Sequence, residues 1–330
     1  MIFIAYYLSP SDGIGSARSL YLLQMLKEHG IKITTISRDT YCSANKLIWI
    51  LNCCKFISSQ TRTVIYISCG PFWYLLPIAL LSYLLGHKLV VDFRDPWSLN
   101  IKTGYGSGIC SNNIKLCIAE FIEKIVYRIS YKIIVCTPGM KMEYGKLFSD
   151  MSKIEIVLNG HMVPKQMLFK IRDDKRIVRV VCVGKFACYC KNADKILDEI
   201  GEKLDILGKN YRIDFYDPDT KLLEIIKNRK NIYVHSRINY AGVMKVLQRA
   251  DIGLCAVRNE EYEFGTKIFD YIAFGIPVYD CFTEGSSFKN YFKDYLISDL
   301  NNLRPLSCDK EEKFSRYNNL KYLVDIIEGV

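Results

Sequence analysis

The sequence lacks the features by which metal centres and disulfide frameworks are usually recognised. No C-x-x-C occurs among its thirteen cysteines, and its four histidines are far apart along the chain. Zinc sites usually show paired cysteines or neighbouring histidines, so we expect no metal site, with one built from distant residues as the alternative. Most of the cysteines lie in apolar runs, where a thiol acts as a small hydrophobe. We expect free thiols in a reducing cytoplasm.

An export signal and a membrane-spanning run are also missing. The N-terminus reads MIFIAYYLSPSDG, with no basic region before its short apolar run, so we expect no signal peptide. The longest apolar stretch, Phe72–Leu85, has 14 residues and is interrupted by Pro77 and Ser82, which is too short to span a bilayer. Peripheral contact with the inner face of a membrane stays open, because it needs no spanning segment.

Positive charge is concentrated in the first half of the chain. The formal net charge is +10, and residues 1–160 hold 17 Lys and Arg against 10 Asp and Glu, a net +7. Such an excess suits a phosphorylated ligand, an anionic membrane surface or nucleic acid. The excess is diffuse and no basic motif with interleaved aromatics accompanies it, so we predict no nucleic-acid partner.

Composition and hydrophobic patterning predict a folded protein with two domains. Half of the 330 residues are hydrophobic, which excludes intrinsic disorder, and ~150 residues per domain is the usual size. The expected strands are Ile2–Leu8, Lys32–Ile36, Val64–Ser68, Lys88–Phe93, Lys132–Cys136, Ile177–Val183, Arg212–Phe215, Ile232–Val234, Ile252–Ala256 and Pro277–Tyr279. The expected helices are Ala17–His29, Asn45–Ile57, Phe72–Leu85, Ile114–Ile129, Ala193–Leu207, Thr220–Asn228, Ala241–Arg249, Thr266–Phe274 and Ser315–Glu328.

This alternation favours two doubly wound, Rossmann-like α/β domains in tandem, joined near residues 160–176. Each would have a parallel sheet with helices on both faces. Ligands of such sheets bind at the carboxyl ends of the strands, so a cleft between the two domains is the expected site.

One expected helix carries an apolar stripe. Ile114, Ile118, Phe121, Ile122, Ile125 and Ile129 recur at helical spacing. We expect the stripe to pack on the core, since such stripes are ordinary for globular helices, with a membrane-facing role as the alternative.

Two candidate sites follow strands of the first half. Gly13 and Gly15 follow the first strand, where glycines let backbone N–H groups approach a phosphate. This is no dinucleotide fingerprint, because Arg18 takes the place of its third glycine. The fourth strand closes with Val91-Asp92-Phe93-Arg94-Asp95-Pro96-Trp97. Its charges form either a local ion pair or an acid and a base that line a cleft.

The second half carries two further signals. Lys185 and Lys191 lie in the loop after its first strand, where ammonium groups suit a diphosphate. Gly265 and Thr266 open a helix, with Thr266 as the expected cap, and Lys267 and Asp270 then share a helix face. Cap, lysine and carboxylate can serve a diphosphate and a ribose, or form an ordinary capped helix with an ion pair.

Four segments in order resemble retaining nucleotide-sugar glycosyltransferases of the GT-B fold, in glycosyltransferase family 4. They are the loop Gly13–Gly15, the segment Phe93–Trp97 (similar to the R-D-x-W of members that build bacterial surface polysaccharides such as O-antigen and capsule), Ile156–Gly160, and Gly265–Val278 (similar to P-x-K-x-x-E-Y-x-A-x-G-x-P-V). The resemblance implies an acceptor-binding domain over 1–165, a nucleotide-sugar domain over 166–310 and a C-terminal helix, 311–330, that packs back on the first domain.

Roles for residues follow from the resemblance. Lys185, Lys191, Lys267 and the N–H groups of Gly265 and Thr266 would hold the donor diphosphate, and Asp270 the ribose. Transfer would be metal-independent and need no cofactor, with a hexose passing to a lipid-linked saccharide oriented by Asp95, Asp92 or Arg94. Trp97, Tyr262 and Glu263 would contact sugar. The family usually has Arg at Lys185 and Glu at both Tyr262 and Asp270.

Two other functions stay open. The first is a nucleotide-sugar epimerase of the same fold, which would need a histidine in the cleft, and His161 and His235 are the candidates. The second is a catalytically weak binding subunit, which the departures at Lys185 and Tyr262 suggest.

Overall fold

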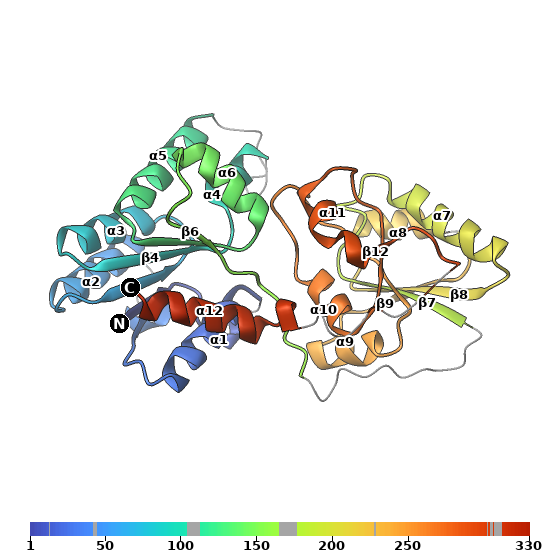
Figure 1. Ribbon diagram of the computed structural model, residues 1–330, viewed down its shortest axis with the longest axis horizontal. Helices are drawn as coiled ribbons and strands as arrows, with labels where there is room; N and C mark the ends of the chain where they lie inside the picture. Colours follow the sequence, from blue (N-terminus) through green and yellow to red (C-terminus); the bar gives the residue numbers. More distant parts are fainter. Residues whose placement is uncertain are drawn as a thin grey trace. The chain divides into compact units, whose positions relative to one another are not determined.

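The strands of this chain form two separate parallel sheets. The computed structural model describes residues 1–12, 14–41, 45–103, 113–164, 177–227, 229–301, 303, 306 and 312–330. These divide into a first unit, Met1–Asn159 with Asn319–Val330, and a second unit, Gly160–Asn318 (Figure 1). The long segment of the first unit therefore ends at Asn159, where the resemblance implied residue 165. The second unit extends to Asn318, where the resemblance implied residue 310.

The sheet of the first unit has the order β2-β1-β3-β4-β5-β6, with every neighbouring pair parallel. Its strands are β1 (Ile2–Ala5), β2 (Thr34–Ile36), β3 (Val64–Ser68), β4 (Lys88–Phe93), β5 (Lys132–Val135) and β6 (Ile154–Ile156). Its helices are α1 (Ile14–Glu28), α2 (Lys46–Ser58), α3 (Leu75–Leu84), α4 (Trp97–Lys102), α5 (Asn113–Ile129), α6 (Pro138–Phe148) and most of α12 (Arg316–Glu328).

The last helix of the chain completes the core of the first unit. Leu320, Leu323, Val324 and Ile327 of α12 are buried in one cluster with Phe3, Tyr66 and Ile134 of the sheet and Leu22 and Leu26 of α1. Figure 1 shows α12 beside α1 on one face of this sheet, with α2, α3, α5 and α6 on the other. Both faces are covered, as a parallel sheet requires.

The sheet of the second unit has the order β12-β11-β10-β7-β8-β9 and is also parallel. Its strands are β7 (Ile177–Val183), β8 (Asn210–Tyr216), β9 (Ile232–His235), β10 (Ile252–Gly253), β11 (Val278–Tyr279) and β12 (Leu296–Ile297). Its helices are α7 (Ala193–Ile206), α8 (Thr220–Ile226), α9 (Tyr240–Leu247), α10 (Lys267–Ala273) and α11 (Ser287–Phe292). Leu197, Ile200 and Leu204 of α7 and Leu222 of α8 pack on Val180, Cys182 and Phe215 of the sheet.

The predicted α/β architecture is confirmed, and several elements were missed. The alternation of strands and helices left out β6, α4, α6, α11 and β12. Of these, α6 carried a readable signal, because Thr137 accepts a hydrogen bond from the Met140 backbone N–H at 3.1 Å and Pro138 stands at the first helical position.

The expectation that the stripe of α5 packs on the core fails for half of the stripe, since Ile122, Ile125 and Ile129 are half-buried and the other three residues are exposed. Ile114, Ile118 and Phe121 are 70%, 51% and 64% exposed. The buried side of α5 consists of Ala119, Glu123, Val126 and Tyr127. Glu123, which is hydrogen-bonded to Ser98 and Tyr144, thus takes a buried position that the sequence prediction gave to the apolar stripe.

Among the residues that the structure describes, no helix combines the length and apolar character needed to cross a membrane. Within the same residues, no three His, Cys, Asp or Glu side chains group as a metal ion would require.

Candidate functional site

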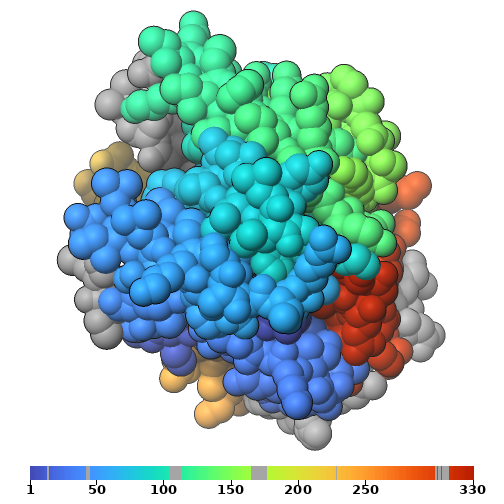
Figure 2. All heavy atoms as spheres, turned by 90° about the vertical axis from the view of Figure 1, so that its left-hand side faces the viewer, coloured from blue at the N-terminus to red at the C-terminus, as the bar shows by residue number. Residues whose placement is uncertain are grey.

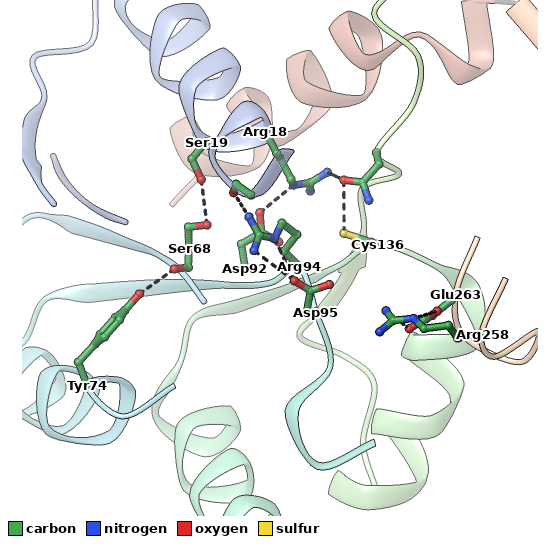
Figure 3. Close-up of polar contacts among 12 residues, drawn as sticks. Arg18, Ser19, Ser68, Tyr74, Asp92, Arg94, Asp95, Cys136, Arg258 and Glu263 are labelled. Atoms are coloured by element: carbon green, nitrogen blue, oxygen red, sulfur yellow. Dashed lines mark hydrogen bonds and ion pairs between the residues drawn. The ribbon is translucent and has the colours of Figure 1, made fainter. Parts of the chain in front are cut away.

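Asp92, at the carboxyl end of β4, lies in a buried charged network. Arg18 Nε donates to Asp92 Oδ2 at 3.0 Å (Figure 3). The Tyr66 hydroxyl donates to the same oxygen at 2.5 Å. The side chains of Arg18 and Asp92 are 3% and 1% exposed. Arg18 Nη1 also donates to Leu158 O and to Asn159 Oδ1, both at 3.3 Å. The network joins α1 and β4 to Leu158 and Asn159, which follow β6. We interpret its role as stabilising the fold of the first unit.

Asp95, three residues later, is placed very differently. Its side chain is 53% exposed, and Arg94 donates to its Oδ2 from Nε at 3.2 Å and from Nη2 at 3.1 Å. Arg94 Nη1 also donates to the carbonyl oxygen of Gly15 in α1 (Figure 3). Arg94 therefore ties the loop after β4 to the first turn of α1 and presents Asp95 to solvent. Gly13 lies outside the described residues.

The start of α4, which carries Trp97, rests on a buried acid that sequence analysis missed. Glu123 Oε1 accepts hydrogen bonds from the Ser98 backbone N–H at 3.2 Å and from the Tyr144 hydroxyl at 2.8 Å. Burial raises the pKa of Glu123 to about 7, and these donors oppose the shift. The Trp97 ring stacks on Phe72 at 5.0 Å and 3°. The sequence signal for Glu123 was its helical spacing from Ala119, Val126 and Tyr127, the other buried residues of α5.

In the second unit, the loop after β7 is built around Gly184. This residue has φ +82°, and its N–H donates to Tyr216 O at 2.6 Å. A Cβ placed on Gly184 would come within 2.7 Å of Lys267 Nζ and 3.0 Å of its Cε. The absence of a side chain thus lets the half-buried Lys267, from the start of α10, cross the end of β7.

Lys185 and Lys191 follow in the same loop, and both are exposed. Asp219, before α8, fixes this loop by accepting hydrogen bonds from the backbone N–H groups of Phe186 at 2.9 Å and Leu222 at 3.1 Å. Although burial opposes the shift, these donors hold the pKa of Asp219 below its usual value. The loop is anchored while its lysine side chains stay in solvent.

Asp270 lies one helical turn beyond Lys267 and is partly exposed. Tyr240, the first residue of α9, donates from its hydroxyl to Asp270 Oδ1 at 2.9 Å. Burial raises the pKa of Asp270 to about 6, while Tyr240, Arg316 and Lys267 favour its ionised form. Tyr240 and Arg316 belong to no sequence motif that we identified, because they are brought to Asp270 from distant segments.

The start of α10 differs from the sequence prediction. Thr266 precedes the helix, as expected, but its side chain makes no capping hydrogen bond, so it is not the predicted cap. The helix is held instead by Tyr271, whose hydroxyl donates toward the carbonyl oxygens of Val181 and Leu254 at 3.1 Å and accepts from the Val183 N–H at 3.3 Å. Gly265 has φ +63°.

The two residues of the second unit that were predicted to contact sugar are engaged within the protein itself. Tyr262 is buried. Glu263 forms a two-bond ion pair with Arg258, at 3.0 Å from Arg258 Nε and 2.6 Å from Nη2 (Figure 3). Of the second-unit predictions, the structure brings Lys267 to Gly184 and places Asp270 one helical turn beyond Lys267, while Tyr262 packs in the interior.

No family model matches this sequence, and no curated protein matches it. Solved structures do match along the whole chain. An apo lipopolysaccharide outer core galactosyltransferase, WaaB, is 10% identical with a TM-score of 0.63, covering 100% of this chain and 99% of its own. A trehalose-6-phosphate synthase is 10% identical with a TM-score of 0.64 and the same coverage. A UDP-GlcNAc 2-epimerase from Methanocaldococcus jannaschii is 13% identical with a TM-score of 0.56, again covering 100% and 99%.

The chain has the GT-B fold. This confirms the fold class that the four motifs predicted. Transferases and an epimerase both appear among the similar structures, so the GT-B fold alone does not choose between these reactions.

Proposed function

We propose that this protein is a retaining glycosyltransferase of family 4 that passes a hexose from a nucleotide sugar to a lipid-linked saccharide during synthesis of a surface polysaccharide such as O-antigen or capsule. The observation that carries the proposal is the constellation at the end of β7, where Lys267 crosses Gly184 and Asp270 lies one turn away. A cation and a carboxylate at the carboxyl edge of a doubly wound sheet suit a nucleotide.

The lysines of the second unit would bind the donor and favour its departure. Lys185 and Lys191 are exposed on an anchored loop, and Lys267 is half-buried beside it. Their ammonium groups would neutralise the charge that develops on the leaving diphosphate, and this electrostatic role needs no metal. The N–H groups of Gly265 and Thr266 would add donors.

The carboxylate of Asp270 would hold the ribose. With a pKa of about 6 it is mostly ionised at neutral pH, and an ionised carboxylate accepts hydrogen bonds from both hydroxyls of a diol. Tyr240 already donates to Oδ1 at 2.9 Å, which orients the group and leaves its other oxygen for the ligand.

Asp95 is the acceptor-orienting residue that we favour in the first unit. It is exposed and held by Arg94, whereas Asp92 is enclosed by Arg18 and Tyr66. We therefore assign Asp92 a positioning role in place of direct contact with substrate. Trp97, stacked on Phe72, offers an aromatic surface next to Asp95. Glu263, with its charge balanced by Arg258, is the remaining candidate for a contact with the transferred sugar.

A donor and acceptor screen tests this proposal. Purified protein is incubated with UDP-, GDP- and dTDP-sugars, each with and without polyprenyl-diphosphate saccharides. We expect one donor to be consumed only when acceptor is present, and NMR of the product to show the anomeric configuration of the donor. Inversion would overturn the retaining assignment, and consumption of no donor with any acceptor would favour the binding subunit.

An epimerase is the second candidate, supported by the likeness to the UDP-GlcNAc 2-epimerase and by a histidine–carboxylate pair. His235 Nε2 lies 2.6 Å from Asp214 Oδ1. His161 is buried and its backbone pairs with Phe314 and Arg316, which favours a structural role. Incubating UDP-GlcNAc alone and following its C2 configuration separates this candidate from transfer.

A further inference from the structure

Three neighbouring helices of the first unit present large apolar side chains to solvent. Helix α3 contacts both α2 and α5, and Figure 2 shows this side of the unit, from α2 in blue through α3 in cyan to α5 in green. Leu51 on α2 is 65% exposed, Leu84 on α3 is 78% exposed and Phe121 on α5 is 64% exposed. The leucine, isoleucine and phenylalanine side chains of these helices that are more than half exposed are called the outer apolar face: Leu47, Leu51, Leu84, Ile114, Ile118 and Phe121.

This face is additional to the side by which each helix packs on the sheet. Trp49, Cys53 and Ile57 are buried on α2, and Leu75, Ile78 and Ala79 on α3. Single exposed apolar residues are normal, but neighbouring helices that all expose such residues mark a surface that meets another apolar phase. On α5 the exposed Ile114, Ile118 and Phe121 are apolar, while the buried side of the helix includes Glu123.

The charges around the outer apolar face are positive, apart from the partly exposed Glu120 of α5. Residues 40–91, which include α2 and α3, contain no Asp or Glu. Lys55 lies one turn beyond Leu51 on α2 and is exposed. Exposed Arg62 reaches the end of α3, where its Nε would be 2.9 Å from a Cβ on Gly86. Lys124 is exposed on α5. Cations therefore flank the apolar side chains on all three helices.

We infer that the outer apolar face docks on a lipid membrane that carries anionic headgroups. Leucine, isoleucine and phenylalanine side chains enter the boundary between headgroups and acyl chains, and flanking lysines and arginines meet the lipid phosphates. A second copy of this face would instead bring cations against cations, which disfavours self-association. The inference deepens the proposed function, because the enzyme would meet a lipid-linked acceptor at this surface. Membrane binding itself is argued from the surface residues, and only its biological purpose rests on the proposed function.

Co-sedimentation with vesicles, in the absence of any sugar, tests the inference. One set of vesicles contains phosphatidylcholine with phosphatidylglycerol, and the other phosphatidylcholine alone. We expect the protein to bind the first set, and the variant Leu51→Glu/Leu84→Glu/Phe121→Glu to bind about tenfold more weakly. The matched control is Ile206→Glu, since Ile206 is 84% exposed on α7 of the second unit, and it should bind like the wild type.

Several outcomes would overturn the inference. These are a triple variant that binds as well as the wild type, an Ile206→Glu variant that loses binding equally, or a wild type that forms dimers through this face and ignores vesicles. Lys55→Ala/Lys124→Ala keeps the apolar side chains and should weaken binding at low salt more than at high salt. An unchanged thermal unfolding curve checks that the variants fold.

The same variants separate this inference from the proposed function. With a water-soluble acceptor analogue, the triple variant should transfer sugar at the wild-type rate while it fails to sediment with vesicles. A protein that sediments with anionic vesicles but uses no donor would leave the membrane surface standing and remove the transferase. Transfer without vesicle binding would do the reverse.

Discussion

The two halves of this chain place a basic residue and an aspartate at the carboxyl edge of their sheets in opposite ways. In the first unit, Arg18 and Asp92 are both buried; Tyr66 donates a hydrogen bond to Asp92, and Asn159 accepts one from Arg18. In the second unit, Lys267 and Asp270 are partly exposed, and the loop beside them is held by Asp219. The Arg18–Asp92 charges are thus buried within the fold of the first unit, whereas Lys267 and Asp270 are partly exposed in the second.

The difference teaches that the residue types alone do not identify a site. Burying a charge is costly unless it is paired, so a buried pair such as Arg18–Asp92 is committed to structure. A partly exposed pair keeps part of its hydrogen-bonding capacity for a ligand. The predictions below are arranged to test this contrast, beginning with the largest expected effect.

Removing the buried cation of the first unit should be strongly destabilising. Arg18→Met leaves Asp92 buried with no opposite charge, and we expect the free energy of unfolding to fall by about 3–5 kcal/mol. Urea unfolding followed by circular dichroism measures it. Arg38→Met is the control, because Arg38 forms its ion pairs at the surface, and it should change stability much less. A loss below ~1 kcal/mol for Arg18→Met would refute the structural assignment.

Glu123 should make the first unit less stable as pH rises. Its pKa in the folded protein is about 7 and its reference value is 4.5, so the folded state holds the proton more tightly than the unfolded state. Between about pH 4.5 and 7 the folded state binds more protons, and stability decreases through this window by up to about 3 kcal/mol.

Glu123→Gln supplies the comparison, because the amide stays neutral at every pH and its oxygen can still accept from Ser98 and Tyr144. The difference in unfolding free energy between variant and wild type should increase in favour of the variant from pH 5 to pH 8. Parallel stability curves over that range would show that Glu123 does not titrate there.

Asp270 should give donor binding a dependence on pH with the opposite sense. Below its pKa of about 6 the carboxyl group becomes protonated and loses acceptor strength for the ribose. We expect affinity for a nucleotide sugar to be about tenfold lower at pH 5 than at pH 7.5 in the wild type. Isothermal titration calorimetry should show no such step in Asp270→Asn. An identical step in both proteins would assign it to another group.

Much of the fold could be predicted, because period-2 and period-3.6 patterns record which side chains are buried. Elements with little room for a pattern, such as the two-residue β12 and the six-residue α4, were missed for that reason. The α5 stripe was identified, but its direction depends on Glu123 and Tyr144, which meet only in the folded chain.

The sequence predicted at which strand ends the candidate site residues lie, but it did not predict which of these residues contact one another. The motif around residues 264–278 located Lys267 and Asp270, and the break in the glycine pattern drew attention to Arg18. The pairing of Arg18 with Asp92, 74 positions away, and of Tyr240 with Asp270 comes from tertiary structure. Thr266 failed as a cap although its residue type favours one, because its backbone is helical (φ −95°, ψ −23°) and a capping residue needs an extended one.

The most direct test of the account is the binding of nucleoside diphosphates to Lys267→Ala. Calorimetric titration of the wild type with UDP, GDP and dTDP should show binding of at least one, and Lys267→Ala should bind it at least about tenfold more weakly, as expected for loss of a charge-assisted contact. Lys195→Ala is the matched control, because Lys195 is exposed on α7, and it should bind like the wild type. Equal affinity of Lys267→Ala and wild type, or no binding of any of the three by the wild type, would contradict the claim that this end of the sheet holds the donor.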